Sequence, residues 1–216
     1  KGLEPEDAFL MRTVEDALRF KDRLKKNDIK HAVVIGASMA GIKVVEVLHK
    51  YGIETWLLDL ASYIFPLAAY KEVAKEIEKR VEAQGVHLMF GVTIDHMEQE
   101  NGEKTAVLTD GSRIPADIVG LCIGTRAITE TVQGEVEIGR GIVVDDHMRT
   151  SVPGIYAAGD CCEGNNLESG QNQIIGLWAN ANHQGETAGI NMAGGDMAYK
   201  GNILHNITHF MNMDFI

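Results

Sequence analysis

The segment from Gly36 to Gly41 has the residue types and the surroundings of a phosphate-binding turn. It follows an apolar, strand-like run from Ala32 to Ile35 and opens a helix-like run. Backbone N–H groups at a helix start carry about half a positive charge, so a pyrophosphate binds there when side chains leave the approach open. The two glycines allow a tight turn and close helix–strand packing. The residues predicted to contact a dinucleotide are Gly36, Ser38, Met39, Ala40 and Gly41.

An acidic residue, Asp59, ends the next strand-like run 23 positions after Gly36. A carboxylate at that place accepts a hydrogen bond from a ribose 2′-hydroxyl. The next three residues are Leu60, Ala61 and Ser62, which supply no cation for a 2′-phosphate, so NAD is favoured over NADP. The alternative is a tight turn with an incidental acid at a strand end. The strand and helix on either side of the glycines favour the dinucleotide interpretation.

A second candidate segment runs from Ile155 to Asp160, about 120 residues after the first. It ends an apolar run with Gly159 followed by Asp160, where a carboxylate can accept hydrogen bonds from a ligand's hydroxyl groups. The pair of segments therefore predicts two nucleotide sites.

Cysteines and histidines give weaker signals. Cys161 and Cys162 directly follow Asp160, but adjacent cysteines form a strained ring when oxidised and lack the C-x-x-C spacing of a working dithiol. Small packed thiols are favoured over a catalytic role, and Cys122 is predicted to lie in the core. His205 and His209 are spaced one helical turn apart without any further ligand pattern. The sequence predicts no metal site, and it identifies no catalytic residue.

Hydrophobic patterning predicts the elements that position these segments. A capping box from Thr13 to Asp16 begins a helix that ends near Asn27. An alternation of strand, helix and strand after it indicates a parallel sheet and an α/β fold. Turns at Asn101-Gly102 and Asp110-Gly111 indicate an antiparallel excursion. The predicted helices are 40–51, 70–83 (with Val73, Ile77 and Val81 on its apolar face) and 175–189, and the predicted strands are 31–35, 55–58, 86–90, 92–98, 105–108 and 118–123.

Composition excludes several partners. The formal net charge is −11 and the isoelectric point is near 5.1, which argues against binding to nucleic acid or to an anionic membrane face. No apolar run reaches the roughly 20 residues of a bilayer span. A cytoplasmic protein is expected, since three cysteines make no disulfide framework. The chain begins at Lys1 and stops in mid-pattern, so we expect a piece of a longer protein.

Several segments together carry a resemblance to a known family. They are Arg12 to Ala17, Asp117 to Arg126 and Thr150 to Asp160, in addition to the glycine turn. The chain resembles the central and later part of the flavin-dependent pyridine nucleotide-disulfide oxidoreductases, which include NADH oxidases, coenzyme A disulfide reductases and rubredoxin reductases. The resemblance implies hydride transfer from NADH to FAD and onward to a disulfide or a small redox partner, with NAD and FAD as cofactors.

The resemblance also implies a domain organisation and further site residues. Residues 1–11 would connect from the FAD domain, 12–127 would form a Rossmann-like NAD-binding domain, 128–195 would return to the FAD domain, and 196–216 would begin a truncated carboxyl-terminal region. Gly124 is assigned to NAD, and Gly159 and Asp160 to FAD, with Asp160 holding the ribityl chain. Trp178, near the start of the last helix, either flanks the flavin ring or anchors that helix to the sheet as a core aromatic.

Two departures from the family keep a second interpretation open. Lys43 stands where the family commonly has a glutamate near the nicotinamide, and the amino-terminal half of the FAD domain has no counterpart before residue 12. A non-catalytic module that binds a dinucleotide or supports oligomerisation is therefore the alternative. The electron acceptor and the oligomeric state stay open, although the resemblance to an often dimeric family makes a homodimer one option.

Overall fold

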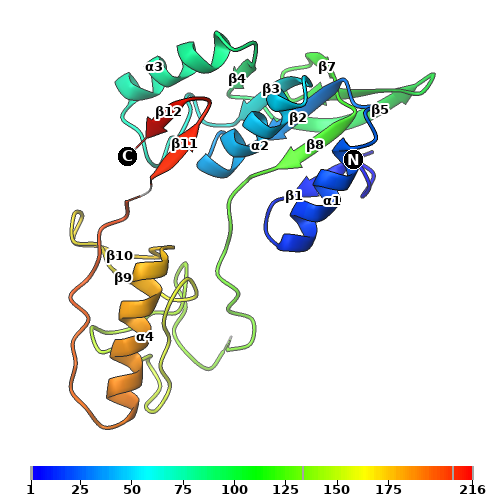
Figure 1. Cartoon of the computed structure of the whole chain (residues 1–216). Coiled ribbons are helices and arrows are strands. Elements are labelled where there is room, and N and C mark those ends of the chain that lie inside the picture. The colour runs from blue at the N-terminus through cyan, green and yellow to red at the C-terminus, as the bar shows by residue number, and fades with distance from the viewer. Residues whose placement is uncertain (1, 133, 206, 216) are drawn as a thin grey trace. The chain divides into compact units, whose positions relative to one another are not determined.

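The computed structural model describes residues 2–132, 134–205 and 207–215. The chain forms two compact units, one of residues 1–124 with 207–216 and one of residues 125–206 (Figure 1). Parallel and antiparallel sheets occur together with helices, so the predicted α/β fold class is confirmed.

A five-stranded parallel sheet forms the centre of the first unit. Its strands lie in the order β1 (Ala8–Leu10), β8 (Ile118–Leu121), β2 (His31–Ile35), β3 (Glu54–Asp59) and β4 (His87–Phe90). Every neighbouring pair is parallel, with Ile35 opposite both Leu58 and Leu121. The carboxyl ends of β2, β3 and β8 therefore meet at one edge of the sheet.

Three helices accompany this sheet: α1 (Val14–Leu24), α2 (Met39–Lys50) and α3 (Lys71–Glu82). The predicted capping box is confirmed, since the Thr13 side chain accepts from the Asp16 N–H while the Asp16 carboxylate accepts from the Thr13 N–H. α3 buries Ala74, Ile77 and Val81. Val73 was expected on that apolar face but is 45 % exposed, because the spacing of three and then four residues selects Ala74 instead.

Both faces of the parallel sheet are covered, and the strand residues alternate between two cores. Val34, Leu57 and Ile118 point toward the core that α1, α2 and α3 share, whereas Val33, Leu58 and Val119 point toward a second core. The second core is closed by an antiparallel sheet of β5 (Ile94–Glu100), β6 (Glu103–Leu108) and β7 (Arg113–Pro115). The predicted antiparallel excursion is thus the outer layer of the unit.

A hairpin near the end of the chain also belongs to the first unit. β11 (Thr208–Phe210) and β12 (Met213–Phe215) pair antiparallel and lie beside α2 (Figure 1). Glu46 on α2 is 7 % exposed and accepts hydrogen bonds from Lys43 (2.7 Å), Lys50 (3.2 Å) and the Met211 N–H (3.2 Å). These bonds fasten the hairpin to the helix.

The second unit contains one long helix, α4 (Trp178–Met192), and a two-stranded sheet of β9 (Gly164–Asn165) and β10 (Asn172–Gln173). Its small core includes Val136, Ile142, Met148 and Cys162. Most of the remaining chain forms loops joined by isolated bridges.

The two units divide the chain differently from the predicted domains. The predicted connector over residues 1–11 contains β1, which is an edge strand of the parallel sheet. The first segment of the first unit ends at Gly124, and residues 207–215 return to it from the predicted carboxyl-terminal region. Assignment of the second unit to flavin binding stays a prediction.

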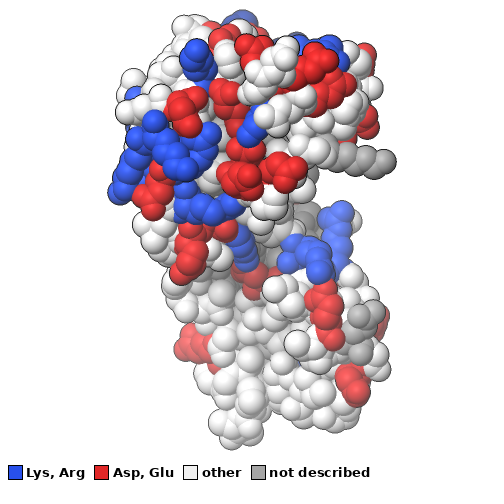
Figure 2. Space-filling model, turned by 90° about the vertical axis from the view of Figure 1, so that its right-hand side faces the viewer, with Lys and Arg blue, Asp and Glu red and all other residues white. Residues whose placement is uncertain are grey.

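Charged side chains of both signs lie on the surface. On the face shown in Figure 2, groups of Lys and Arg side chains alternate with Asp and Glu. Several exposed pairs of the chain bond directly, such as Lys25 with Asp22 (2.7 Å). Within residues 2–132, 134–205 and 207–215, no helix has the length and apolar character that a bilayer crossing requires.

The Glu46 cluster makes stability depend on pH. Burial raises the pKa of Glu46, but the bonds from Lys43, the Met211 N–H and Lys50 outweigh it and lower the pKa from 4.5 to about 2. Because the folded pKa is depressed, the stabilisation is complete above pH 4.5 and is lost as the pH falls toward 2. We expect Glu46→Gln to lower the free energy of unfolding at pH 7 by about 3 kcal/mol, and by less at pH 3.5, in urea titrations. An equal loss at both pH values would contradict this account.

Candidate functional site

The predicted phosphate-binding turn joins β2 to α2 at the carboxyl edge of the sheet. Gly36 has a φ of +105°, and a Cβ there would collide with the carbonyl of Cys122, the residue that follows β8. A Cβ at Gly41 would collide with the Gly36 carbonyl. Both positions therefore require glycine, and both let α2 approach the sheet closely.

Ser38 is the N-cap of α2, which explains why serine is tolerated at a position where glycine is usual. Its Oγ accepts from the Gly41 N–H (3.3 Å) and donates to the Cys122 carbonyl (3.3 Å). The hydroxyl is thus drawn back against the helix. Among the hydrogen bonds of the described residues, none engages the N–H groups of Met39 or Ala40. These are two of the four donors that a helix start leaves free.

Asp59 lies directly beside this turn. Its Oδ2 accepts from the Ala37 N–H (2.6 Å) and its Oδ1 from the Ala61 N–H (2.8 Å). The carboxylate is only partly buried and has about four acceptor sites in total, so it keeps lone pairs for a further donor. The structure therefore brings Asp59 together with residues 36–41. Gly124, the other residue predicted for NAD, lies three residues beyond β8 with a φ of +91°.

Lys43, the departure from the family pattern, has two partners. Its ammonium donates to Glu46 and to the His209 carbonyl of the hairpin. The lysine therefore contributes to docking the hairpin.

The residues predicted for FAD lie in the second unit. Gly159 has a φ of +82° and donates its N–H to the Gln184 side-chain oxygen (2.8 Å). Asp160 is exposed and lies beside Gly176, just before α4. Trp178 begins α4 and is 91 % exposed, so the prediction of a core aromatic is wrong. Whether it flanks a flavin stays a prediction.

The buried face of α4 is polar, which the apolar patterning did not reveal. Asn180, Gln184, Thr187 and Asn191 are all at most 5 % exposed. Asn180 donates to the Ile175 carbonyl (2.9 Å), and Asn191 donates to the carbonyls of His147 (2.9 Å) and Met197 (2.8 Å). The spacing of four, three and four residues is helical, and it would have shown this face had amides been counted with apolar residues.

All three cysteines are free. Cys122 is buried, which raises the pKa of its thiol to about 11 and confirms the predicted core position. Cys162 is fully buried, and both its neighbour Cys161 and its burial raise its pKa, which disfavours a thiolate there. Cys161 donates to the Ala158 carbonyl (3.3 Å). Cys162 therefore fits the favoured interpretation of a packed thiol, whereas Cys161 is only partly buried and its hydrogen bond with Cys162 lowers the pKa of its thiol to about 6.

The two histidines spaced as one helical turn are not on a helix. His205 lies in a loop of the second unit, whereas His209 lies on β11 and pairs with Asp214 (2.7 Å). A separate group of possible ligands, Asp145, Asp146 and His147, is largely exposed. Its histidine bonds to Asp146 (2.6 Å) and Asp196 (2.9 Å), so a network of side chains accounts for it.

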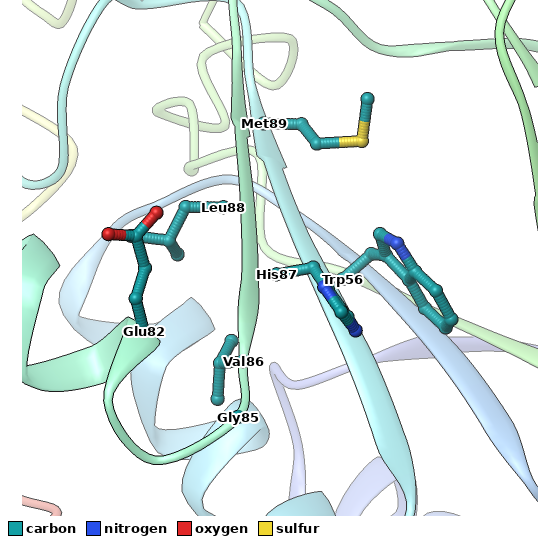
Figure 3. Close-up of a pocket in the computed structure, with 7 residues that line it drawn as sticks. All are labelled: Trp56, Glu82, Gly85, Val86, His87, Leu88 and Met89. Atoms are coloured by element: carbon teal, nitrogen blue, oxygen red, sulfur yellow. The ribbon is translucent and has the colours of Figure 1, made fainter.

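An open hollow of about 390 Å³ lies elsewhere, along the edge strand β4 (Figure 3). Trp56 and His87 stack there with ring centres 4.7 Å apart, on the same side of β4 as Met89, and Leu88 lies on the other side. None of the predicted site residues lines it; its lining is Trp56, Glu82, Gly85, Val86, His87, Leu88 and Met89. The carboxyl edge of the sheet, and not this hollow, is the candidate site.

Comparisons with known proteins show which family the sequence is similar to. The sequence matches the pyridine nucleotide-disulphide oxidoreductases over residues 1–185. An NADH oxidase of Methanocaldococcus jannaschii is 28% identical over 196 residues, covering 90% of this chain and 44% of that protein. A NAD-dependent persulfide reductase from A. fulgidus has a TM-score of 0.87 at 28% identity, covering 98% of this chain and 39% of that one. The water-forming NADH oxidase from Lactobacillus brevis, bound to NADH, has a TM-score of 0.89 at 26% identity, covering 97% and 46%.

The chain spans less than half the length of these relatives. The family match nevertheless extends over most of the 216 residues and includes both the glycine turn and the segment that ends in Asp160. The chain belongs to the pyridine nucleotide-disulphide oxidoreductase family.

Proposed function

We propose that the first unit binds NADH and presents its hydride to a flavin held partly by the second unit, within an NADH-dependent flavoprotein oxidoreductase. One observation carries the proposal: unengaged N–H groups at the start of α2 lie next to a carboxylate at the end of β3. The positive end of the helix dipole and the free N–H donors can bind a diphosphate. The carboxylate can accept a hydrogen bond from the ribose beside that diphosphate. The relative from Lactobacillus brevis, with a similar fold, is bound to NADH.

The residues present fit a dinucleotide. Gly36 leaves the backbone accessible, and Met39 and Ala40 would donate their N–H groups to phosphate oxygens. Asp59 would accept from the adenosine ribose with the lone pairs that Ala37 and Ala61 leave free. Its negative charge would repel a 2′-phosphate, which supports NADH over NADPH.

The second unit would hold the flavin through polar and aromatic groups. Bound FAD supplies the capacity to accept a hydride and to pass electrons on singly or in pairs. The exposed Asp160 carboxylate would accept from hydroxyl groups of the ribityl chain, and the exposed Trp178 ring would offer a flat apolar surface. The amino end of α4 would place a positive dipole near an anionic ring.

The acceptor would be a disulfide or a small redox protein. The compared relatives are named for different acceptors, since one is a water-forming oxidase and another a persulfide reductase. The candidate NADH site lies apart from Cys161 and Cys162 in the sequence. These two adjacent cysteines lack the C-x-x-C spacing of a working dithiol. We therefore assign the reduction of the acceptor to groups outside the residues described above.

Loss of the Asp59 charge should weaken NADH binding. In Asp59→Asn we expect the dissociation constant for NADH to rise roughly 10- to 100-fold, because a charge-assisted hydrogen bond contributes about 1.5 to 3 kcal/mol. The preference for NADH over NADPH should fall as well, as measured by calorimetric titration. Asp110→Asn, at an exposed turn acid that bonds Ser112, is the matched control and should leave both values unchanged. An unaltered dissociation constant in folded Asp59→Asn would remove Asp59 from the site.

Flavin content and its reduction separate the oxidoreductase from a non-catalytic module. The full-length protein should be yellow when purified. Addition of NADH in the absence of oxygen should decrease the absorbance band of the oxidised flavin. A panel of disulfides, oxygen and small iron proteins would then identify the acceptor by reoxidation. A colourless protein that binds NADH without oxidising it would support the module, for which the departure at Lys43 is the favourable observation.

A further inference from the structure

The hairpin of β11 and β12 is built around a strained turn whose first residue, Met211, is buried. Met211 and Asn212 both have positive φ values, 47° and 60°, as a two-residue type I′ turn requires. Methionine rarely adopts this conformation, yet Met211 is 5 % exposed. Its N–H donates to Glu46 and its carbonyl accepts from Gln84 (3.3 Å). Contacts with the first unit therefore hold the turn in its conformation.

Aromatic packing joins this hairpin to the loop that follows Asp59. Phe65 is 2 % exposed and packs against two hairpin rings, with its ring centre 5.5 Å from that of Phe210 and 5.2 Å from that of Phe215. Phe65 itself has a φ of 54°, which is unusual for a bulky residue. Surrounding contacts must impose such a conformation, and the hairpin supplies the aromatic part of them.

Phe65 also bonds directly to the candidate dinucleotide turn. Its N–H donates to the Ala37 carbonyl (2.9 Å), while the Ala37 N–H donates to Asp59 (2.6 Å). The peptide groups on both sides of Ala37 are thereby fixed. A continuous path of contacts leads from the hairpin through Phe65 to the backbone that would face the diphosphate.

We propose that the hairpin of residues 208–215 is a brace for the dinucleotide turn, with Phe210 and Phe65 as positioning residues. The inference rests on the proposed binding of NADH. Loss of the brace frees Phe65 to leave its left-handed conformation, which removes the bond to Ala37 and lets the turn adopt shapes that bind a diphosphate poorly. Coupling of this kind is reciprocal, so bound NADH must also stabilise the docked hairpin.

The first test compares two matched substitutions in the full-length protein. Phe210→Leu removes the hairpin ring that packs against Phe65. Phe20→Leu makes the same change at a buried phenylalanine whose ring centre lies 5.2 Å from that of Phe9 in the edge strand β1. We expect the dissociation constant for NADH to rise at least about fivefold in Phe210→Leu and to stay unchanged in Phe20→Leu. Equal effects in the two variants would overturn the proposal.

The second test uses the wild-type protein alone, so it does not depend on whether a variant folds. Hydrogen exchange of the amides in residues 208–213 should slow at least about fivefold when NADH saturates the wild-type protein, whereas amides of α1 should not change. Exchange that is unaffected in the hairpin while NADH is bound would overturn the brace and leave the proposed function intact. Absence of NADH binding in the wild-type protein would instead refute the proposed function.

Discussion

The peptide groups around Ala37 are the point on which the candidate site depends. The Ala37 N–H donates to the Asp59 carboxylate, and the Ala37 carbonyl accepts from the Phe65 N–H. A loop between a strand and a helix usually carries unpaired backbone groups that water satisfies. Here one residue uses both of its backbone groups within the protein, and the free donors lie two and three residues further on, at Met39 and Ala40. The turn is thus organised before any ligand arrives, which lowers the entropic cost of binding.

Layering of the first unit explains why the candidate site lies at the carboxyl edge of the sheet. Helices cover one face of the parallel sheet and the antiparallel strands β5 to β7 cover the other. Most of both faces is therefore buried, and the ends of the central strands are left accessible. The carboxyl edge is where α2 begins and where Asp59 lies, in accordance with the general position of ligands in open α/β sheets.

Sequence reasoning predicted those parts that local patterning specifies. The capping box at Thr13, the strand from His31 and the antiparallel excursion were all confirmed, because each is encoded by residues close together in the chain. The strand β1 and the hairpin of β11 and β12 were not predicted, since three-residue strands gain their stability from distant partners such as β8 and α2. The adjacency of Asp59 to the turn followed from the parallel register, whereas the contact of Phe65 with Phe210 spans 145 positions and leaves no local signal.

The polar face of α4 determines how that helix can move. A helix held by leucine and valine can rotate or slide by small amounts at little cost, because apolar contacts are not directional. Asn180 and Asn191 instead bond to specific backbone carbonyls, and Gln184 to the Gly159 N–H, across nearly the full length of α4. Any screw motion about the axis would leave several buried amides without partners at once. These bonds therefore resist rotation of the helix about its axis. The Trp178 end keeps a fixed orientation relative to the loop that carries Asp160.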